Sequence, residues 1–216
     1  MKGKTKYIPA LKLKVLTRFF DPLMGITGLE QKFSLALLYQ ANIKSGDIVL
    51  DFGCGTGTLT IMMKGLVPTA TIHGLDIDSQ ILNIARNKSK KQGSEIFYQE
   101  YDGTTLPYQR ETFDKVTSSL VFHHLIRSEK IAALKDIHRV LKYGGELHVL
   151  DFGQARNILM RVLFLPIQVF DGFANTTDNV RGLLPDIIAK AGFNEVEERN
   201  YMTTVVGNIS LYKALK

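Results

Sequence analysis

Residues 49–58 read VLDFGCGTGT and combine one carboxylate, Asp51, with three closely spaced glycines. These glycines are Gly53, Gly55 and Gly57. Glycines at every second position after a strand allow the backbone to turn sharply into a helix and to approach a ligand. A dinucleotide-binding loop would place its third glycine at position 58, where this chain has threonine. A carboxylate before the loop would also repel a pyrophosphate. The loop therefore predicts a ligand that carries positive charge, with a ligand-free strand–turn–helix as the alternative.

Further acids follow the next two predicted strands. Asp76 lies about 20 residues past the glycine loop, where a carboxylate can bind vicinal ribose hydroxyls, and Ile77 can pack on an adenine ring. Asp102 would reach the exocyclic amine of adenine, and Gly103 would allow close approach. Together with Asp51, these acids end three successive parallel strands, at the edge where open α/β sheets bind ligands. The combination predicts S-adenosyl-L-methionine, whose ammonium and sulfonium groups are positively charged.

Two adjacent histidines, His123 and His124, lie just past the end of the fourth predicted strand, beside the expected methyl group. Methyl transfer from a sulfonium depends mainly on orientation, and a base is needed only where the acceptor atom must lose a proton. Neutral histidine is a natural general base near pH 7. We expect His123 to take this role, while a capping or packing role is the favoured alternative for His124. Tyr101, Tyr108 and Asp151 are weaker candidates near the same rim.

Strands and helices alternate along the chain, and they would place these residues at one edge of a sheet. Strands are expected at 48–52, 71–75, 95–100, 113–119, 146–150, 193–199 and 205–215. Helices are expected at 59–66, from a cap at Asp78 or Ser79 to Gly93, from a cap at Ser128 to a stop at 143–145, and at 183–191. This order predicts an α/β fold, a doubly wound and mostly parallel sheet with helices on both faces.

Several of these motifs resemble class I S-adenosylmethionine-dependent methyltransferases. They are the glycine loop, Gly74-Leu75-Asp76, Asp102, the segment from Phe113-Asp114 to His124, and Arg139-Val140-Leu141-Lys142-Tyr143-Gly144-Gly145. The closest likeness is to the ubiquinone/menaquinone biosynthesis methyltransferases, of methyltransferase type 11, and it covers about residues 20–153. The resemblance implies a Rossmann-like sheet of seven strands with an antiparallel last strand. It also implies cofactor contacts at Gly53, Gly55, Thr60, Asp76, Ile77, Asp102, Gly103 and Ser119. The quinone enzymes typically have Arg-Asn where this chain has His123-His124, so the acceptor stays open.

Composition and length indicate a single domain. A chain of 216 residues with 45% hydrophobic residues can bury one large core. Cys54 is the only cysteine, so an internal disulfide and a cysteine-based metal cluster are excluded. The five histidines show no H-E-x-x-H pattern, and we predict no metal site. The expected parts are an N-terminal helical arm or cover at 1–30, a cofactor-binding core at 40–153, a lid-like insertion at 154–182, and a C-terminal helix and strands at 183–216.

Basic residues are concentrated at the N-terminus. The net charge is +6, and six basic residues precede the first acid, Asp21, so the rest of the chain is formally neutral. Residues 8–20 place apolar side chains on one helical face, and residues 158–170 are nearly all apolar. Each segment could pack on the sheet or on another protomer; alternatively, it could cover an apolar acceptor or contact a membrane surface. With no signal-like apolar block, the sequence predicts a cytoplasmic protein, with peripheral membrane contact as an open alternative.

The predicted function is methyl transfer to a small acceptor that is apolar or aromatic, such as a quinone or another lipid-like molecule. A nucleic-acid methyltransferase is the second candidate, favoured only by the isoelectric point near 9.3. Against it, the chain reads Ser118-Ser119-Leu120-Val121 after the fourth strand and has no Asn/Asp-Pro-Pro-Tyr motif there. A non-catalytic module that binds S-adenosylmethionine is the third. We therefore expect a small-molecule acceptor and no nucleic-acid partner.

Overall fold

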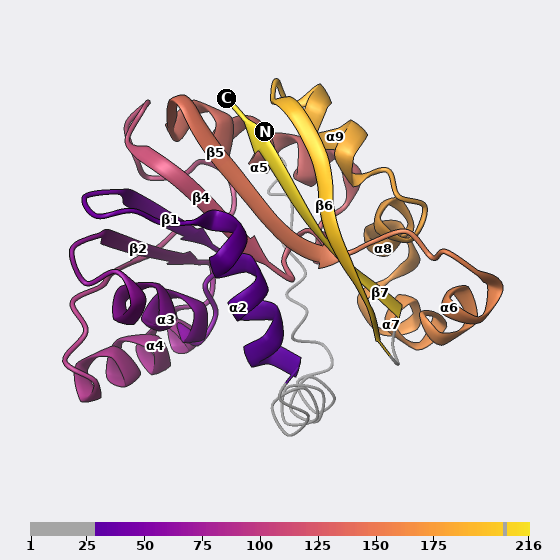
Figure 1. The fold of residues 1–216 in the computed structure, drawn as a ribbon. Coiled ribbons are helices and arrows are strands. Elements are labelled where there is room, and N and C mark those ends of the chain that lie inside the picture. The colour runs from indigo at the N-terminus through magenta and orange to yellow at the C-terminus, as the bar shows by residue number, and fades with distance from the viewer. Residues whose placement is uncertain (1–28, 205–206) are drawn as a thin grey trace, which may run out of the picture.

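The computed structural model describes residues 29–204 and 207–216, which contain a seven-stranded sheet flanked by helices (Figure 1). The strands are β1 (Ile48–Phe52), β2 (Thr71–Asp76), β3 (Phe97–Glu100), β4 (Phe113–Ser119), β5 (Leu141–Phe152), β6 (Asn194–Thr204) and β7 (Gly207–Leu215). They are ordered β3-β2-β1-β4-β5-β7-β6. The first five strands pair in parallel, and β7 pairs antiparallel with both β5 and β6. The predicted sheet with an antiparallel last strand is therefore confirmed.

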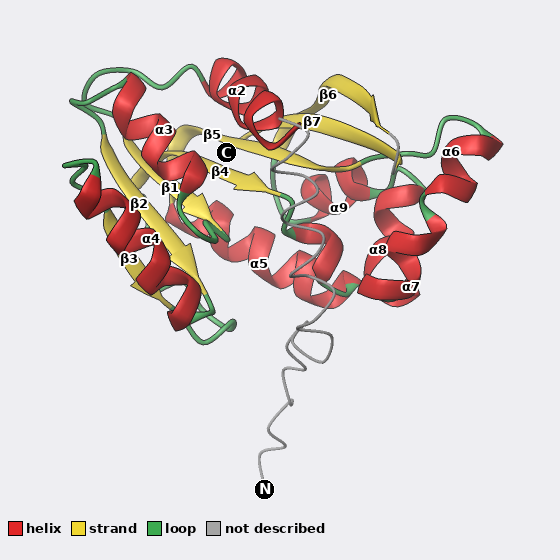
Figure 2. Cartoon of the chain, turned by 90° about the horizontal axis from the view of Figure 1, so that it is seen from below, coloured by secondary structure: helices red, strands yellow, loops and turns green. Residues whose placement is uncertain are grey.

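Helices cover both faces of this sheet (Figure 2). They are α2 (Leu29–Ala41), α3 (Thr58–Leu66), α4 (Ser79–Lys91), η2 (Phe122–His124, a 3₁₀ turn), α5 (Arg127–Val140), α6 (Ile158–Leu163), α7 (Leu165–Asp171), α8 (Phe173–Val180) and α9 (Leu184–Lys190). Side chains of α2 and α3 pack in one buried apolar cluster, whereas those of α5 and α9 pack in another. Neighbouring residues of β1 follow this division, because Val49 belongs to the first cluster and Leu50 to the second.

The chain reverses its direction of travel across the sheet between β1 and β4. From β1 it proceeds outward to β2 and β3, and it then returns to place β4 on the other side of β1. The loops after β1 and β4 therefore lie at the carboxyl ends of neighbouring strands, where open α/β sheets bind ligands. The glycine loop and the His123-His124 pair are therefore delivered to the same edge of the sheet.

Some local boundaries differ from the sequence-based expectation. Asp78 caps α4 as predicted, since its carboxylate accepts hydrogen bonds from the backbone N–H groups of Gln80 and Ile81. The predicted cap at Ser128 is wrong: α5 begins at Arg127, where the Glu129 carboxylate accepts a hydrogen bond from the Ile126 N–H. The predicted stop at 143–145 is also wrong. The helix ends at Val140, and the following residues already belong to β5, with a bulge that absorbs the extra residues.

The segment that follows β5 contains α6, α7 and α8, where the sequence indicated an irregular stretch around one apolar run. Pro166 lies in the first turn of α7 and separates it from α6. Figure 1 shows these three helices gathered beside the β6–β7 hairpin. Strand β6 runs to Thr204 instead of ending at residue 199. Within the described ranges no helix combines the length and the hydropathy needed to cross a bilayer. The expected arm at 1–30, including the helix at 8–20, lies almost wholly outside the described residues, which begin within it at Leu29.

Candidate active site

The three glycines of the loop after β1 have different surroundings, although each has a positive φ angle of 53–78°. A Cβ atom at Gly53 would lie 2.3 Å from Val121 Cγ2, and one at Gly57 would lie 2.6 Å from the Tyr98 hydroxyl. A Cβ atom at Gly55 would meet nothing within 4 Å. Close packing therefore explains the first and third glycines. Gly55 alone among the three borders open space, and this is where a ligand can approach the backbone.

Asp76 fixes the loop from the neighbouring strand. Its Oδ2 accepts a hydrogen bond of 2.9 Å from the Gly55 N–H, and its Oδ1 accepts one of 3.0 Å from the Asp78 N–H. The backbone N–H groups of Gly53 and Cys54 both donate to the Leu75 carbonyl, at 2.8 and 2.9 Å. The end of β2 thus holds the glycine loop and places a carboxylate beside its open position.

Asp51 is a buried carboxylate whose hydrogen bonds are incomplete. Its Oδ1 accepts a bond of 3.1 Å from the Thr117 hydroxyl, while its Oδ2 is buried without a partner among the described residues. Burial, opposed by the hydrogen bond from Thr117 and assisted by the charge of Asp76, raises the pKa of Asp51 to about 7. A cation would stabilise two carboxylates in such a place. The arrangement fits the positively charged groups of S-adenosyl-L-methionine.

The other predicted cofactor residues fall into two groups. Ile77 and Gly103 lie together, since a Cβ atom at Gly103 would lie 3.9 Å from Ile77 Cγ2. Asp102 is exposed, and the hydrogen bonds from Thr104 hold its pKa below the usual value. Ser119 is half-buried at the end of β4. Ile77, Asp102 and Gly103 come after the ends of β2 and β3, and Ser119 ends β4, so all four lie at the edge of the sheet that carries the loop.

Thr60 does not reach this edge, contrary to the expectation of a direct contact. Its side chain is fully buried, its hydroxyl donates to the Gly57 carbonyl at 2.8 Å, and it lies 3.1 Å from the Tyr98 hydroxyl. Gly57 is buried in the same place. Both residues therefore shape the first turn of α3 beneath the loop. Sequence spacing could not reveal this, because Tyr98 reaches them from β3.

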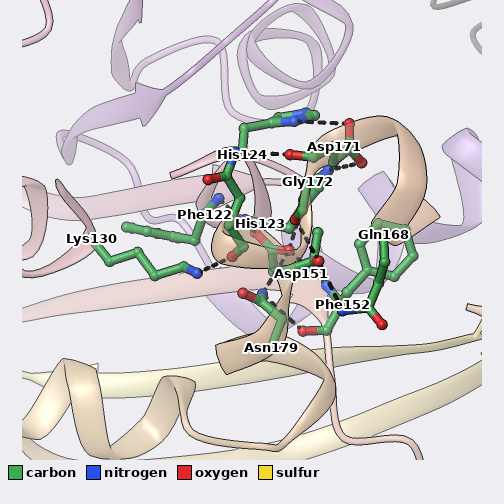
Figure 3. A network of polar contacts seen from close by, with 12 residues as sticks. Phe122, His123, His124, Lys130, Asp151, Phe152, Gln168, Asp171, Gly172 and Asn179 are labelled. Carbon is green, nitrogen blue, oxygen red and sulfur yellow. Dashed lines mark hydrogen bonds and ion pairs between the residues drawn. The ribbon is translucent and has the colours of Figure 1, made fainter. Parts of the chain in front are cut away.

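On the acceptor side, Asp151 organises the turn that carries His123 (Figure 3). His123 is 4% exposed, and its Nδ1 lies 2.9 Å from Asp151 Oδ1. The other carboxylate oxygen accepts from the Phe122 and His123 N–H groups, at 2.7 and 3.3 Å. Because a carboxylate only accepts, Nδ1 of His123 carries the proton, and Nε2 of the neutral ring keeps a lone pair. Burial and the charge of neighbouring His124 lower the pKa of His123.

Two residues of this network had no sequence signal. The Asn179 side chain donates to Asp151 Oδ1 at 3.1 Å, and Asp171 closes the site from the end of α7 (Figure 3). Asp171 Oδ2 lies 3.8 Å from His123 Nε2, and its Oδ1 lies 3.4 Å from His124 Nδ1. Burial opposes ionisation of Asp171, but the hydrogen bond from His124 and the charges of both histidines hold its pKa below the usual value. Both residues belong to the segment where the sequence indicated no regular structure.

The three weaker candidates for the general base are Tyr101, Tyr108 and Asp151, and none of them is placed as His123 is. Tyr108 packs edge-on against Phe113 at 4.8 Å, and burial raises its pKa to about 12, which does not suit a base. Tyr101 packs near Phe52, with ring centroids 6.0 Å apart. Asp151 is fully buried and acts through His123. His123 and His124 remain the candidates for proton transfer.

The two halves of the site meet through Val121. This residue directly precedes η2, and its side chain packs against Gly53 so tightly that no Cβ atom would fit between them. The rings of Phe52 and Phe122 also stack, with centroids 5.9 Å apart. The glycine loop and the histidine turn are therefore in direct contact.

Comparison with known proteins identifies the family. Residues 49–145 match the family described as "Methyltransferase domain". The chain is 36% identical to the ubiquinone/menaquinone biosynthesis C-methyltransferase of Bdellovibrio bacteriovorus over 131 residues, 61% of this chain and 54% of the relative. It is 31% identical to the Xanthomonas oryzae enzyme of the same name over 178 residues, 80% of this chain and 67% of the relative.

Among solved structures, a SAM-dependent methyltransferase from Aquifex aeolicus has a TM-score of 0.64 at 19% identity, covering 85% of this chain and 89% of that one. This likeness concerns the fold. The chain spans about half the length of the Bdellovibrio bacteriovorus relative and about two thirds of the length of the Xanthomonas oryzae relative. The chain belongs to the class I S-adenosylmethionine-dependent methyltransferases of the ubiquinone/menaquinone biosynthesis type, whose cofactor is S-adenosyl-L-methionine.

Proposed function

We propose that this chain transfers a methyl group to a small apolar or aromatic acceptor of a quinone-like or lipid-like kind. One observation carries the proposal. The glycine loop, which has an unpartnered carboxylate oxygen of Asp51 beside it, contacts through Val121 the turn that carries His123, the histidine oriented by Asp151. S-adenosyl-L-methionine supplies an electrophilic methyl group when bound. The names of the curated relatives, C-methyltransferases of ubiquinone and menaquinone biosynthesis, support the acceptor class.

On the cofactor side, each residue has a role that follows from its surroundings. Asp51 and Asp76 would face the positive charge and the ribose hydroxyls, beside the open backbone at Gly55. Four residues would surround the adenosine: Ile77, Asp102, Gly103 and Ser119. Gly53, Gly57 and Thr60 would act indirectly, by holding the loop against Val121 and Tyr98.

On the acceptor side, His123 would accept a proton at Nε2. Asp151 fixes the opposite ring nitrogen as the donor, so the lone pair needed for this step is always on the same atom. Asp151 is itself held by backbone and side-chain donors, which limits rotation of the ring. His124 is the second candidate, since its side chain is 42% exposed and also faces Asp171.

We further propose that residues 154–182 cover the acceptor, within one domain that also includes the core and the C-terminal strands. Helix α8 packs against both α7 and η2, next to His123. Apolar side chains of this segment are exposed to solvent: Ile158, Leu159, Val162, Val169, Phe170 and Phe173. Arg161 and Arg181 line a hollow between α6 and α8. Such a surface suits an apolar acceptor held near the headgroups of a membrane.

Transfer of labelled methyl groups tests the acceptor class. The protein is incubated with methyl-labelled cofactor and a cell extract separated into quinone-containing lipids, small soluble molecules and nucleic acids. We expect label in the lipid fraction, and His123→Gln should abolish most of it. Label in nucleic acid would support the alternative methyltransferase class. Tight cofactor binding without label in any fraction would support a non-catalytic module.

Vesicle sedimentation tests the membrane contact separately. We expect binding to vesicles with anionic lipids and little binding to neutral ones. Replacing Leu159 and Val162 by serine should reduce sedimentation, because both side chains are more than half exposed and support no buried packing. Deletion of residues 1–18, which lie outside the described residues, should also reduce it while cofactor affinity stays nearly unchanged. Equal sedimentation of all variants would contradict this contact.

A further inference from the structure

We propose that His123, His124 and Asp171 form a binding site for a divalent transition metal of the Zn²⁺ class. Each residue offers one ligand atom, a ring nitrogen or a carboxylate oxygen, and the three atoms lie within 4.8 Å of one another. The residues come from η2 and from the last position of α7, so the fold brings them together. Figure 3 shows Asp171 facing the two histidines.

The separations are close to those around a bound metal. Ligand atoms at zinc–ligand distances of 2.0–2.2 Å in a tetrahedral site lie about 3.3–3.6 Å apart. Here the distance from His124 Nδ1 to Asp171 Oδ1 is 3.4 Å, and that from His123 Nε2 to Asp171 Oδ2 is 3.8 Å. The two contacts involve different oxygens of the half-buried Asp171 carboxylate, and one ligand atom from each of the three residues lies within 4.8 Å of the other two.

His123 has the support that metal-binding histidines have. Its Nδ1 donates to Asp151 at 2.9 Å, and this leaves the Nε2 lone pair toward Asp171. Asp151 is fixed in turn by the N–H groups of Phe122 and Phe152 and by Asn179. A carboxylate behind a histidine in this way fixes its orientation and raises its basicity as a ligand. The arrangement is therefore more than a surface pair of a histidine and an acid.

The nearby basic side chains pair with groups other than Asp171. Lys130 donates to the Asn175 carbonyl and lies 3.7 Å from Asp178, and Arg127 also pairs with Asp178. In the described part of the chain, Asp171 has ion pairs with the two histidines and with no lysine or arginine. A neutral His123 therefore presents a lone pair to a carboxylate, an arrangement that a cation between them would stabilise.

The ligand atoms define the kind of metal. Two imidazoles and one carboxylate suit Zn²⁺, Co²⁺ or Ni²⁺, whereas Mg²⁺ and Ca²⁺ prefer oxygen ligands alone. Three protein ligands leave a position for water or for an oxygen atom of the acceptor. A metal on Nε2 would occupy the lone pair proposed for proton transfer, so metal-loaded and metal-free protein should differ in turnover. Only this last point rests on the proposed function.

Metal titration of the full chain, with neither cofactor nor acceptor present, tests the site. The chelator-treated protein is titrated with Zn²⁺ by calorimetry and with Co²⁺ by visible absorption. We expect one metal per chain, no binding of Mg²⁺, and weakening by more than about tenfold in His124→Ala and in Asp171→Ala. The matched controls, His138→Ala on α5 and Asp186→Ala on α9, should bind like the unmodified chain.

Absence of Zn²⁺ binding would overturn the proposal, as would equal weakening in the control variants or unchanged affinity in Asp171→Ala. His124 and Asp171 are not fully buried, and thermal unfolding of each variant verifies that the fold is intact. Because the titration contains no cofactor, its failure would leave methyl transfer untouched. Failure of methyl transfer would equally leave the metal titration unaffected.

Discussion

The cofactor half of the site comes from residues 51–103, which lie close together in the sequence, whereas the acceptor half joins His123 to Asp151, Asp171 and Asn179 from three later elements. In the first half, each acid lies at or just past the carboxyl end of its own strand, and parallel pairing brings them to one edge. In the second half, side chains bond directly to side chains. The first half therefore depends on strand order, and the second on how α7 and α8 pack.

The two halves also differ in how their buried carboxylates are satisfied. Asp51 accepts one hydrogen bond and keeps an oxygen without a partner among the described residues. Asp151 accepts bonds from Phe122, His123, Phe152 and Asn179. An unsatisfied buried carboxylate is stabilised by a cationic ligand, whereas a fully bonded one holds its neighbours in place. We therefore expect Asp51 to bind the ligand and Asp151 to position its neighbours, and four experiments test this contrast between the two halves.

The largest expected effect is at the open glycine of the loop. Gly55→Val should abolish cofactor binding, because its side chain would occupy the space where a ligand approaches. Gly46→Val is the matched control, since Gly46 also has a positive φ angle and open surroundings but lies in the turn before β1. Both variants should lose about 1–2 kcal/mol of stability from backbone strain. Calorimetric titration with S-adenosylmethionine should show a loss of binding only in the first; equal affinities would contradict the loop assignment.

If His123 is the general base, its replacement should lower turnover without weakening cofactor binding. His123→Gln should lower methyl transfer by about 10²–10⁴-fold, the range typical of a removed general base. His148→Gln is the control, because His148 is also buried but lies within β5, where its ring lies 3.1 Å from the Glu146 carboxylate. Turnover with the labelled cofactor and binding by calorimetry are measured in parallel. A His123→Gln variant with unchanged turnover would show that this histidine only packs.

The carboxylate at the end of β2 should affect cofactor binding more than stability. Asp76→Ala should weaken binding by about 3 kcal/mol, roughly 100-fold, through loss of charge-assisted bonds to the ribose and to the Gly55 N–H. Asp78→Ala should instead cost about 1 kcal/mol of stability, since it removes the cap of α4. Calorimetry and thermal unfolding separate the two effects. Similar affinities of both variants would remove Asp76 from the binding site.

The smallest effect is the dependence of cofactor affinity on pH. In the ligand-free protein, burial raises the pKa of Asp51 to about 7, so the carboxyl is mostly protonated below that pH. A cationic ligand favours the ionised form, and binding must therefore release a proton at lower pH. Affinity should fall by about tenfold between pH 8 and pH 6. Calorimetry in two buffers of different ionisation enthalpy measures the proton release.

Asp51→Asn is the control for this measurement. The variant retains the titration of the ligand's own amino group but lacks the titration of Asp51. Its affinity should consequently lose most of the dependence found in the unmodified chain between pH 6 and pH 8. The same proton release in both proteins would place the titrating group elsewhere.

Much of the cofactor half could be predicted from the sequence because its determinants are local. The glycine spacing, the acids at strand ends and the cap at Asp78 each depend on a few neighbouring residues. The roles of Gly57 and Thr60 could not be predicted, since both depend on Tyr98, which arrives from β3. The start of α5 was misplaced because the Glu129 carboxylate reaches back to the Ile126 N–H, in competition with a plausible cap at Ser128.

By itself, the sequence determined the order of the strands, the helices α3, α4, α5 and α9, and the family, because periodicity and turn residues act over short distances. Only the tertiary structure decided that Asp151 would orient His123, and that Asp171 and Asn179 would complete the network. These contacts join η2 and β5 to two helices in a segment with weak local signals. These contacts depend on packing between parts of the chain that are distant in sequence, and such packing produces no recognisable residue spacing.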